Sequence, residues 1–240
     1  MSAVLEVSGL EKHFDGLHVI DDLSFTVGEE ALGIVGPNGA GKTTMLNLVA
    51  GELRPDRGSV RFDGREITRL SAHRRARAGI GRTAQIPRPF DGLTVYENVL
   101  AGAMFASGSG RRARARLAVA ALARTEMLEA ANVRAGSLRL LDRKRLEIAR
   151  ALATRPRVLL LDEIAGGLTE PEIERLVELI RAIRGEGVVI VWIEHVLHAL
   201  LAVADRLIAM DRGRALVAGD PQDVMTSDAV RSIYLGEAAP

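Results

Sequence analysis

Residues 31–51 read ALGIVGPNGAGKTTMLNLVAG: an apolar run, a glycine-rich loop and then a helical pattern. Gly36, Gly41, Lys42 and Thr43 fit the spacing G-x-x-x-x-G-K-[ST]. Glycines let successive loop N–H groups turn toward one anion, and a helix beginning near Lys42 aims the positive end of its dipole at the same place. A glycine turn that merely starts a helix is the alternative interpretation. Because the pattern lies between a strand and a helix, it predicts a phosphate-binding loop in an α/β fold.

The predicted loop is suited to the phosphates of a nucleotide and to a magnesium ion. Lys42 can neutralise the β- and γ-phosphates, and the Thr43 hydroxyl can ligate Mg²⁺. The guanine-reading motif Asn-Lys-x-Asp does not occur in the sequence, which favours ATP. Phe14 is a candidate to stack on adenine, and packing at a strand end is an equal alternative. The predicted cofactors are ATP and Mg²⁺, and the predicted loop contacts are Gly36, Pro37, Asn38, Gly39, Ala40, Gly41, Lys42, Thr43 and Thr44.

Two further apolar runs end in residues with suitable chemistry. VLLLDE places Asp162 at the carboxyl end of a buried strand, where open α/β sheets bind ligands and a carboxylate can hold Mg²⁺. Glu163 follows as a candidate general base for an attacking water. VVIVWIE leads into His195, an imidazole predicted at the same sheet edge, within reach of a γ-phosphate. Taken singly, the acids also suit a solvated strand end, and the histidine suits a helix start at the surface.

The remaining pattern predicts one α/β architecture. Continuous apolar runs suit strands buried on both faces of a parallel sheet, at 31–35, 158–161 and 188–193. Alternating segments indicate an antiparallel edge, at 3–7, 23–27 and 58–62, the last closed by the turn Asp63-Gly64. Residues from about 86 to 155 are Ala- and Arg-rich with helical periodicity. We therefore expect a single domain whose core comprises 1–85 and 156–240, with a helical subdomain at about 86–155.

Local signals inside this architecture are also specific. Thr169 and Glu172 form a capping box for a helix whose apolar face comprises Ile173, Leu176, Val177, Ile180 and Ile183. The segment 103–110 has the composition of a flexible connection. RRARAR at 111–116 is interpreted as a solvated helix face rather than a nucleic-acid or lipid patch.

Composition excludes several classes of protein. Hydrophobic residues make up 48% and charged residues 26%, which is ordinary for a globular chain, and the net charge of +1 gives no general attraction to nucleic acid. The chain has no cysteine, so disulfides and thiolate metal sites are excluded. No run approaches the roughly 18–20 apolar residues of a membrane helix, and the first residues lack a signal pattern. Any membrane crossing is therefore expected to belong to other chains.

The order of the motifs resembles that of the ATP-binding subunit of an ABC transporter, from about residue 3 to 236: GPNGAGKTT, Gln85 in GIGRTAQ, RLEIARAL, VLLLDE and then His195. The resemblance implies a P-loop NTPase with a RecA-like core, an antiparallel β edge and an inserted helical subdomain. It implies that Phe14 stacks on adenine and that Glu163 is the catalytic carboxylate. It further implies that Gln85 senses Mg²⁺ and water while contacting a transmembrane partner, and that His195 is a catalytic switch histidine.

Several longer phrases are similar to the ATPases of branched-chain amino acid-type importers: GRTAQIPRPFDGLTVYENVLAG, KRLEIARALATRPRVLLLDE, AGGLTEPE, IEHV and SIYLGEA. This resemblance implies an ATP-hydrolysing, energy-coupling subunit for branched-chain amino acids or related amino acids and amides. The implied partners are a second ATP-binding subunit, transmembrane permease subunits and, indirectly, a substrate-binding protein, with no nucleic acid. The implied location is peripheral, at the cytoplasmic face of the cell membrane. A soluble ABC ATPase acting on nucleic acid or ribosomes and a regulatory nucleotide binder with weak hydrolysis are the alternatives.

One motif departs from the family it resembles. There, two subunits close head to tail, and the signature of one, commonly LSGGQ, completes the nucleotide site of the other. The matching positions here are Leu138, Arg139, Leu140, Leu141 and Asp142. Leu141 adds bulk where glycine admits backbone N–H groups, and Asp142 brings negative charge near an anion. Arg139 is the candidate substitute donor, Asp142 is alternatively an N-cap for the following helix, and an asymmetric pair of subunits is the resulting hypothesis.

Overall fold

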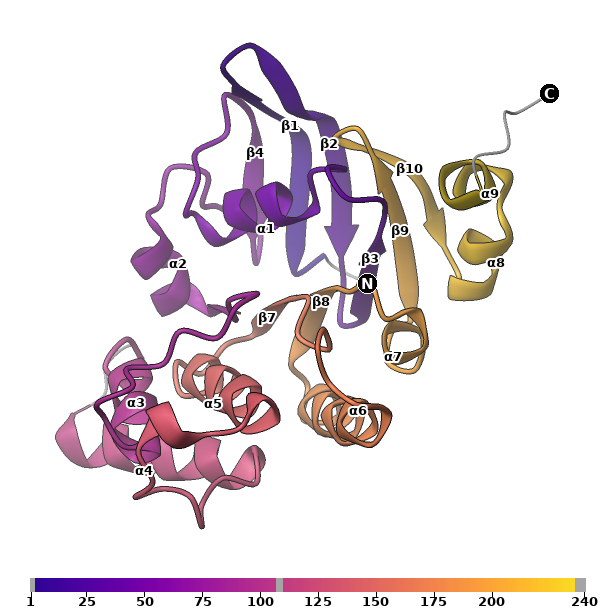
Figure 1. The fold of residues 1–240 in the computed structure, drawn as a ribbon. Coiled ribbons are helices and arrows are strands. Elements are labelled where there is room, and N and C mark those ends of the chain that lie inside the picture. The colour runs from indigo at the N-terminus through magenta and orange to yellow at the C-terminus, as the bar shows by residue number, and fades with distance from the viewer. Residues whose placement is uncertain (1–2, 107–109, 236–240) are drawn as a thin grey trace. The chain divides into compact units, whose positions relative to one another are not determined.

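The computed structural model describes residues 3–106 and 110–235. Two predictions therefore lie partly outside the described residues: the connection at 103–110 includes 107–109, and SIYLGEA extends beyond 235. The chain forms two compact units, Met1–Ala72 with Val191–Pro240, and His73–Ile190 (Figure 1). Among the described helices, none is both long and apolar enough to cross a membrane.

The first unit contains an antiparallel sheet at the N-terminal end of the chain. Its strands are β1 (Leu5–Phe14), β2 (Leu17–Val27), β4 (Arg57–Phe62) and β5 (Arg65–Glu66), in the order β2-β1-β4-β5. The strand β1 pairs antiparallel with both β2 and β4. At the β4–β5 turn, Asp63 and Gly64 adopt φ values of 49° and 70°, as expected for an Asp-Gly hairpin. The predicted antiparallel edge is confirmed.

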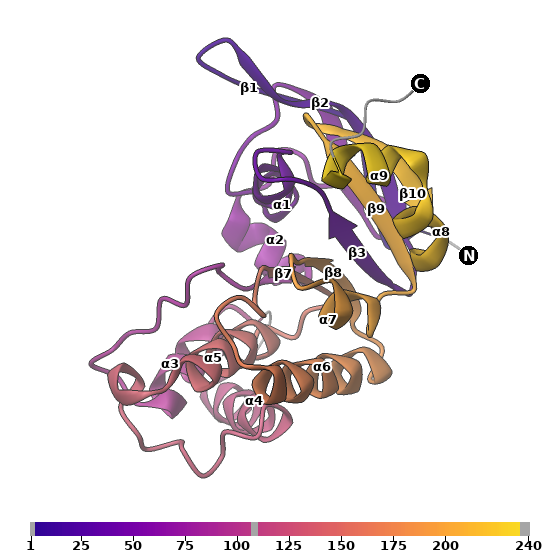
Figure 2. The same cartoon turned by 45° about the vertical axis from the view of Figure 1, so that its right-hand side comes forward.

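The same unit carries the strand that precedes the glycine-rich loop. The strand β3 (Ala31–Val35) is buried at every residue and runs parallel to β9 (Arg206–Asp211), which pairs antiparallel with β10 (Arg214–Gly219). The helix α1 (Lys42–Ala50) follows the loop, and α7 (Leu197–Leu201) precedes β9. Figure 2 shows α8 (Pro221–Thr226) packed against β9 and β10, with α9 (Asp228–Leu235) beside it.

The second unit combines a parallel strand pair with most of the helices. The strands β6 (Ile80–Arg82) and β7 (Val158–Asp162) pair in parallel, and β7 is buried throughout. The helices α3, α4 and α5 pack on one another, and α5 also contacts β6 and α6. The helical elements are α2 (Ala72–Ala78, whose first residue is in the first unit), α3 (Val95–Ala103), α4 (Arg111–Arg124), η1 (Ala135–Ser137), α5 (Leu140–Leu152) and α6 (Glu170–Gly185).

The domain boundaries stay a prediction. Between 95 and 152 the described elements are helical. The boundaries between the two compact units fall near residues 72 and 190 of the sequence, whereas the predicted subdomain boundaries are about 86 and 155. Strand β8 (Val189–Ile193) runs across the second division point and is buried at every residue. The three predicted buried strands are confirmed as β3, β7 and β8.

The start of α6 follows directly from its sequence. The N–H and Oγ1 of Thr169 both donate to Glu172 Oε2, each at 2.9 Å, completing the predicted capping box. All five apolar residues of the predicted face are buried. In α4, Arg111, Arg112 and Arg116 are exposed and Arg114 is partly buried, so three of the four arginines agree with a solvated helix face.

Candidate nucleotide site

The glycine-rich loop between β3 and α1 is held by its packing from one side. A Cβ on Gly41 would lie 2.6 Å from the carbonyl oxygen of Val19, and Gly41 has a φ of 94°, so only glycine suits this position. Gly39 also has a positive φ, 84°, but a Cβ there would meet nothing within 4 Å. The loop is thus fixed against β2 at Gly41 and open at its tip.

Lys42 places a positive charge over this loop. Its Nζ donates to the carbonyl oxygens of Gly36 and Pro37, at 2.7 and 2.9 Å, although the residue is only 6% exposed. Of the other predicted contacts, Asn38 and Gly39 are exposed, Pro37, Thr43 and Thr44 are partly exposed, and Ala40 is buried. A buried ammonium group, a helix N-terminus and an open loop tip together fit the phosphates of a nucleotide.

Asp162 is the last residue of β7 and is fully buried. Its Oδ2 lies 3.1 Å from Nη2 of Arg82, the last residue of β6, in an ion pair. Its backbone N–H donates to Oγ1 of Thr83 at 3.4 Å. A carboxylate and the hydroxyl of Thr43 are hard oxygen ligands of the kind Mg²⁺ prefers, so the donor types fit that ion. The role of Arg82 was not predicted, because an arginine in a short strand gives no periodic signal.

The structure brings together two residues that were predicted separately. The side-chain amide of Gln85 donates from Nε2 to Glu163 Oε2 over 2.5 Å, across 78 positions of sequence. Glu163 also adopts a φ of 47°, a conformation that costs a non-glycine residue about 1 kcal/mol or more. The carboxylate predicted as the catalytic base is therefore positioned by both its backbone and Gln85.

His195 follows the buried strand β8 and is exposed. Its backbone N–H donates to Oε1 of Glu194 at 2.9 Å, and the N–H of Val196 donates to the same oxygen at 3.3 Å. Glu194 is 2% exposed, so a buried carboxylate fixes the chain where β8 ends. This arrangement presents the imidazole at the carboxyl end of a strand, as the sequence predicted.

Phe14 ends β1 and is 41% exposed. The ammonium group of Lys12 lies 5.4 Å from its ring centroid and 2.8 Å from Asp56 Oδ1. Hydrogen bonds from Lys12 and then from the backbone N–H and ring of His13 hold the pKa of Asp56 far below its usual range. The aromatic ring is thus accessible for stacking, beside an ion pair that steadies the strand.

The segment 138–142, which differs from the common signature of the family it resembles, lies at the start of α5. This helix begins at Leu140, and its N-cap is Arg139, with φ −72° and ψ 165°. Asp142 is the third residue of the helix, so its interpretation as the N-cap is wrong, because the chain is already helical two residues earlier. Leu141 is 6% exposed and Leu140 is 40% exposed. Arg143 secures the preceding turn by donating to the carbonyl oxygens of Leu138 and Gly136, at 3.0 and 2.7 Å.

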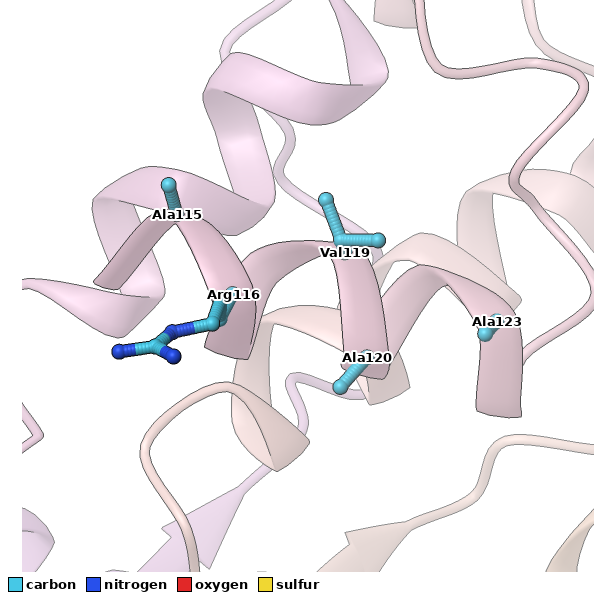
Figure 3. A pocket seen from close by; sticks show the side chains of 5 residues that line it. All are labelled: Ala115, Arg116, Val119, Ala120 and Ala123. Atoms are coloured by element: carbon cyan, nitrogen blue, oxygen red, sulfur yellow. The ribbon is translucent and has the colours of Figure 1, made fainter. Parts of the chain in front are cut away.

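A separate hollow of about 360 Å³ lies on α4, shown in Figure 3. Its lining residues are Ala115, Arg116, Val119, Ala120 and Ala123. None of them was predicted to contact the nucleotide, and the lining contains no carboxylate and no glycine. The candidate site therefore rests on the loop, strand-end and side-chain contacts described above.

Known proteins resemble this chain in sequence and in fold. The family model described as "ABC transporter" matches residues 20–166. The chain is 38% identical to the high-affinity branched-chain amino acid transport ATP-binding protein BraF of Pseudomonas aeruginosa, over 98% of each chain. It is 35% identical to the lipopolysaccharide export system ATP-binding protein LptB of Acidithiobacillus ferridurans, over 99% of this chain and 98% of that protein. Among solved structures, it is similar to the ATP-binding cassette MJ1267 in its ADP conformation, with a TM-score of 0.89, 27% identity and coverage of 99% and 100%. The similarities to BraF, LptB and MJ1267 extend over nearly the whole chain, and the family model covers residues 20–166.

Proposed function

The chain belongs to the ABC transporter family, and from this premise we propose that it is the energy-coupling subunit of an importer for branched-chain amino acids or related amino acids and amides. It is an ATPase of that family, with the α/β fold of a P-loop NTPase. The observation that carries the importer assignment is the 38% identity to BraF over nearly all of both chains. We also propose which residues bind the nucleotide and which hydrolyse it.

Binding of the nucleotide is assigned to the first unit. Phe14 offers an exposed ring to the adenine, and Lys42 offers its ammonium group to the β- and γ-phosphates in place of the loop carbonyls it contacts now. The N-terminus of α1 adds backbone N–H donors. The hydroxyl of Thr43 and the carboxylate of Asp162 are the proposed protein ligands of Mg²⁺, and Gln85 is a third candidate. When bound, the metal ion supplies neutralisation of charge that develops on the phosphate oxygens.

Hydrolysis is assigned to the carboxylate of Glu163. It would orient an attacking water and accept its proton, and the bond from Gln85 holds one of its oxygens in a fixed direction. His195 would donate a hydrogen bond toward the γ-phosphate from the end of β8. Gln85 is also proposed to contact a membrane partner. The hydrogen bond between Gln85 and Glu163 would therefore link that partner to the catalytic base.

The start of α5 supports the proposal of an unequal pair of subunits. The backbone at Arg139 and Leu140 leads into a helix N-terminus, so N–H donors are present, but Leu141 is a buried side chain where the family commonly has glycine. Loss of one donor to a developing charge costs about 10²- to 10³-fold in rate in comparable sites. We therefore propose that a different subunit with an intact signature completes this chain's site, and that the site completed by Arg139, Leu141 and Asp142 is weaker.

A second candidate function differs in cargo and direction. The 35% identity to LptB over nearly the whole chain is close to the 38% identity to BraF, and LptB is named as part of a lipopolysaccharide export system. Either assignment places the chain peripherally at the cytoplasmic face of a membrane, next to permease subunits. The two assignments differ in the partners that the chain must contact.

Affinity purification of the tagged chain from detergent-solubilised membranes of its host tests the proposal. We expect multi-span permease subunits and a second, different ATPase to co-purify, and the same cells to lose uptake of labelled branched-chain amino acids when Glu163→Gln replaces the wild type. The matched control is Glu170→Gln, which changes an exposed acid in the first turn of α6. Recovery of soluble or ribosomal proteins alone would overturn the transport assignment, and a lipopolysaccharide-export defect without loss of uptake would favour the second candidate.

A further inference from the structure

One short segment of the second unit contacts the neighbouring carboxylates at three points. Arg82 forms an ion pair with Asp162 at 3.1 Å, Thr83 accepts the backbone N–H of Asp162 at 3.4 Å, and Gln85 donates to Glu163 at 2.5 Å. Four consecutive positions therefore hold both the proposed metal ligand and the proposed catalytic base.

The geometry of the strands explains why the arginine reaches Asp162. The strands β6 and β7 are parallel neighbours, with Arg82 in register with Leu160, and Thr83 N–H donates to the carbonyl oxygen of Leu160 at 3.0 Å. Asp162 lies two residues further along β7, on the same face as Leu160 by strand periodicity. The long guanidinium group spans this offset, so the ion pair is a product of the sheet register.

Solvent does little to screen this ion pair. The side chain of Asp162 is 1% exposed and that of Arg82 is 14% exposed. Withdrawing a charged carboxylate from water to this extent is costly, and a neighbouring cation compensates for the lost hydration. Arg82 supplies such a charge.

We propose that Arg82 is a positioning residue that competes with Mg²⁺ for the carboxylate of Asp162. The inference rests on the proposed function, in which Asp162 is a ligand of Mg²⁺. A divalent ion would attract the carboxylate of Asp162 more strongly than the monovalent guanidinium group does, so Arg82 would give up this ion pair when Mg²⁺ binds. Arg82 thus holds the carboxylate of Asp162 in place and sets the Mg²⁺ concentration needed to displace the guanidinium group.

This competition reaches the catalytic base through the same segment. Arg82 and Gln85 are three residues apart, and Thr83 between them is tied to β7. Release of Arg82 from Asp162 loosens one end of the segment whose other end holds Glu163 through Gln85. Metal binding at Asp162 therefore weakens the restraint on Glu163.

Arg82→Met in the full chain tests the competition without relying on turnover. Two quantities are measured: the thermal midpoint in EDTA, and the Mg²⁺ concentration that half-saturates binding of a fluorescent ATP analogue. In EDTA, we expect the midpoint to fall by roughly 5–10 °C, because the variant leaves a buried carboxylate without its guanidinium partner. At fixed analogue concentration, we expect the half-saturating Mg²⁺ concentration to fall about tenfold, because the competing cation is gone.

Arg206→Met is the matched control. Arg206 Nη2 pairs with Glu30 Oε1 at 2.8 Å, in the first unit, with side-chain exposures of 27% and 23%. Its loss should lower the thermal midpoint without changing the Mg²⁺ requirement. An unchanged or increased Mg²⁺ requirement in Arg82→Met, or the same decrease in the control, would overturn the inference.

A second variant keeps the test decisive if Arg82→Met does not fold. Adding Asp162→Asn removes the charge that needs a partner, so the double variant should recover folding, and failure of both variants to fold would contradict the inference. Measurements on the wild-type chain distinguish a failure of this inference from a failure of the proposed function. Wild-type chain that fails to bind the analogue in Mg²⁺ refutes the nucleotide site itself, whereas normal wild-type binding with an unaltered Arg82→Met refutes only the competition.

Discussion

Two helices of this chain begin in opposite ways. The helix α1 follows Gly41, whose φ of 94° is left-handed and whose neighbour Val19 leaves no room for a side chain. The helix α5 follows Arg139, whose backbone is extended at φ −72° and ψ 165°, and its second residue is the buried Leu141. Both starts present the positive end of a helix, but the first follows a residue without a side chain, whereas the second has a buried leucine at its second position.

The two helix N-termini therefore differ in how well they suit an anion. At α1 the loop is open at Gly39 and Lys42 adds a positive charge. At α5 the preceding turn is fixed by Arg143, which bonds the carbonyl oxygens of Leu138 and Gly136. The first start is built for a ligand, whereas the second is stabilised by its own side chains. The following experiments test that contrast.

Replacement of the lysine at the first start should have the largest effect. Lys42→Met removes the ammonium group that lies over the loop, so ATP turnover should fall by about 10²- to 10³-fold or more, as for loss of a preorganised donor to developing charge. Steady-state phosphate release measures turnover, and binding of a fluorescent ATP analogue measures nucleotide affinity. The control is Arg206→Met, which removes a cation in the same unit but outside the loop and should leave turnover intact. Turnover within twofold of wild type in Lys42→Met would refute the role of the loop.

Restoring a family-like signature at the second start should raise activity. Arg139→Ser with Leu141→Gly reopens the backbone at the beginning of α5, and turnover of the reconstituted complex should rise by about tenfold or more, since each missing donor costs up to about 10³. Removal of a buried leucine also lowers stability, so thermal unfolding is measured in parallel. Leu128→Ser, at an exposed position of the same unit but outside the signature, serves as the control. Unchanged or lower turnover in a folded double variant would contradict the asymmetric pair.

Much of this contrast could be predicted from the sequence, because its signals are local. Glycines at fixed spacing after an apolar run predicted the loop, and the apolar runs predicted β3, β7 and β8. Thr169 with Glu172 predicted the start of α6 in the same way. The residues of each such pattern lie close together in the sequence, so local backbone geometry determines the loop, strand or helix start that they form.

The features that the sequence did not predict depend on contacts between residues far apart in the sequence, or on which of several neighbouring residues begins a helix. Arg82 meets Asp162 only because β6 and β7 are parallel neighbours in a particular register. Asp142 has the usual chemistry of an N-cap, but the helix starts two residues earlier, where burial of Leu141 stabilises the first turn. Tertiary packing decided both cases.

A pair of glycine substitutions sharpens the account of the first start. Gly41→Ala and Gly39→Ala both place a Cβ on a left-handed residue, which costs about 1–2 kcal/mol. The Cβ at Gly41 also meets the carbonyl oxygen of Val19 at 2.6 Å, whereas the one at Gly39 meets nothing. Gly41→Ala should therefore be less stable than Gly39→Ala by about 1 kcal/mol or more in urea unfolding. Equal losses would show that packing against β2 does not shape the loop.

The smallest expected effect concerns a third kind of helix start, a side-chain cap. At α3, Thr94 Oγ1 accepts the N–H of Glu97 at 3.1 Å, and Thr94→Ala should cost about 1 kcal/mol. Arg139→Ala, at an N-cap with no side-chain bond, should change stability by less than about 0.5 kcal/mol. Urea unfolding at neutral pH measures both, and equal losses would contradict the distinction.

The cap at α3 also has an expected pH dependence. Hydrogen bonds from the backbone and then the side chain of Thr94 hold the pKa of Glu97 below the ordinary value of 4.5. A depressed pKa contributes stability that is present above the unfolded-state pKa and is lost as pH falls through the folded-state pKa. The difference between wild type and Thr94→Ala should therefore narrow as the pH is lowered from neutral to below about 4. A difference that stays constant over this range would show that the bond from the Thr94 hydroxyl to the Glu97 carboxylate contributes nothing to stability.

The role of Glu163 as the catalytic base is tested by single-turnover ATP hydrolysis by the complex, with wild-type chain and with Glu163→Gln. We expect the variant to bind MgATP with wild-type affinity but to release phosphate at least about 10²-fold more slowly, because an amide cannot accept the proton of the attacking water. Glu170→Gln should match the wild type. Equal rates of phosphate release in wild type and Glu163→Gln would contradict the assignment of this carboxylate as the catalytic base.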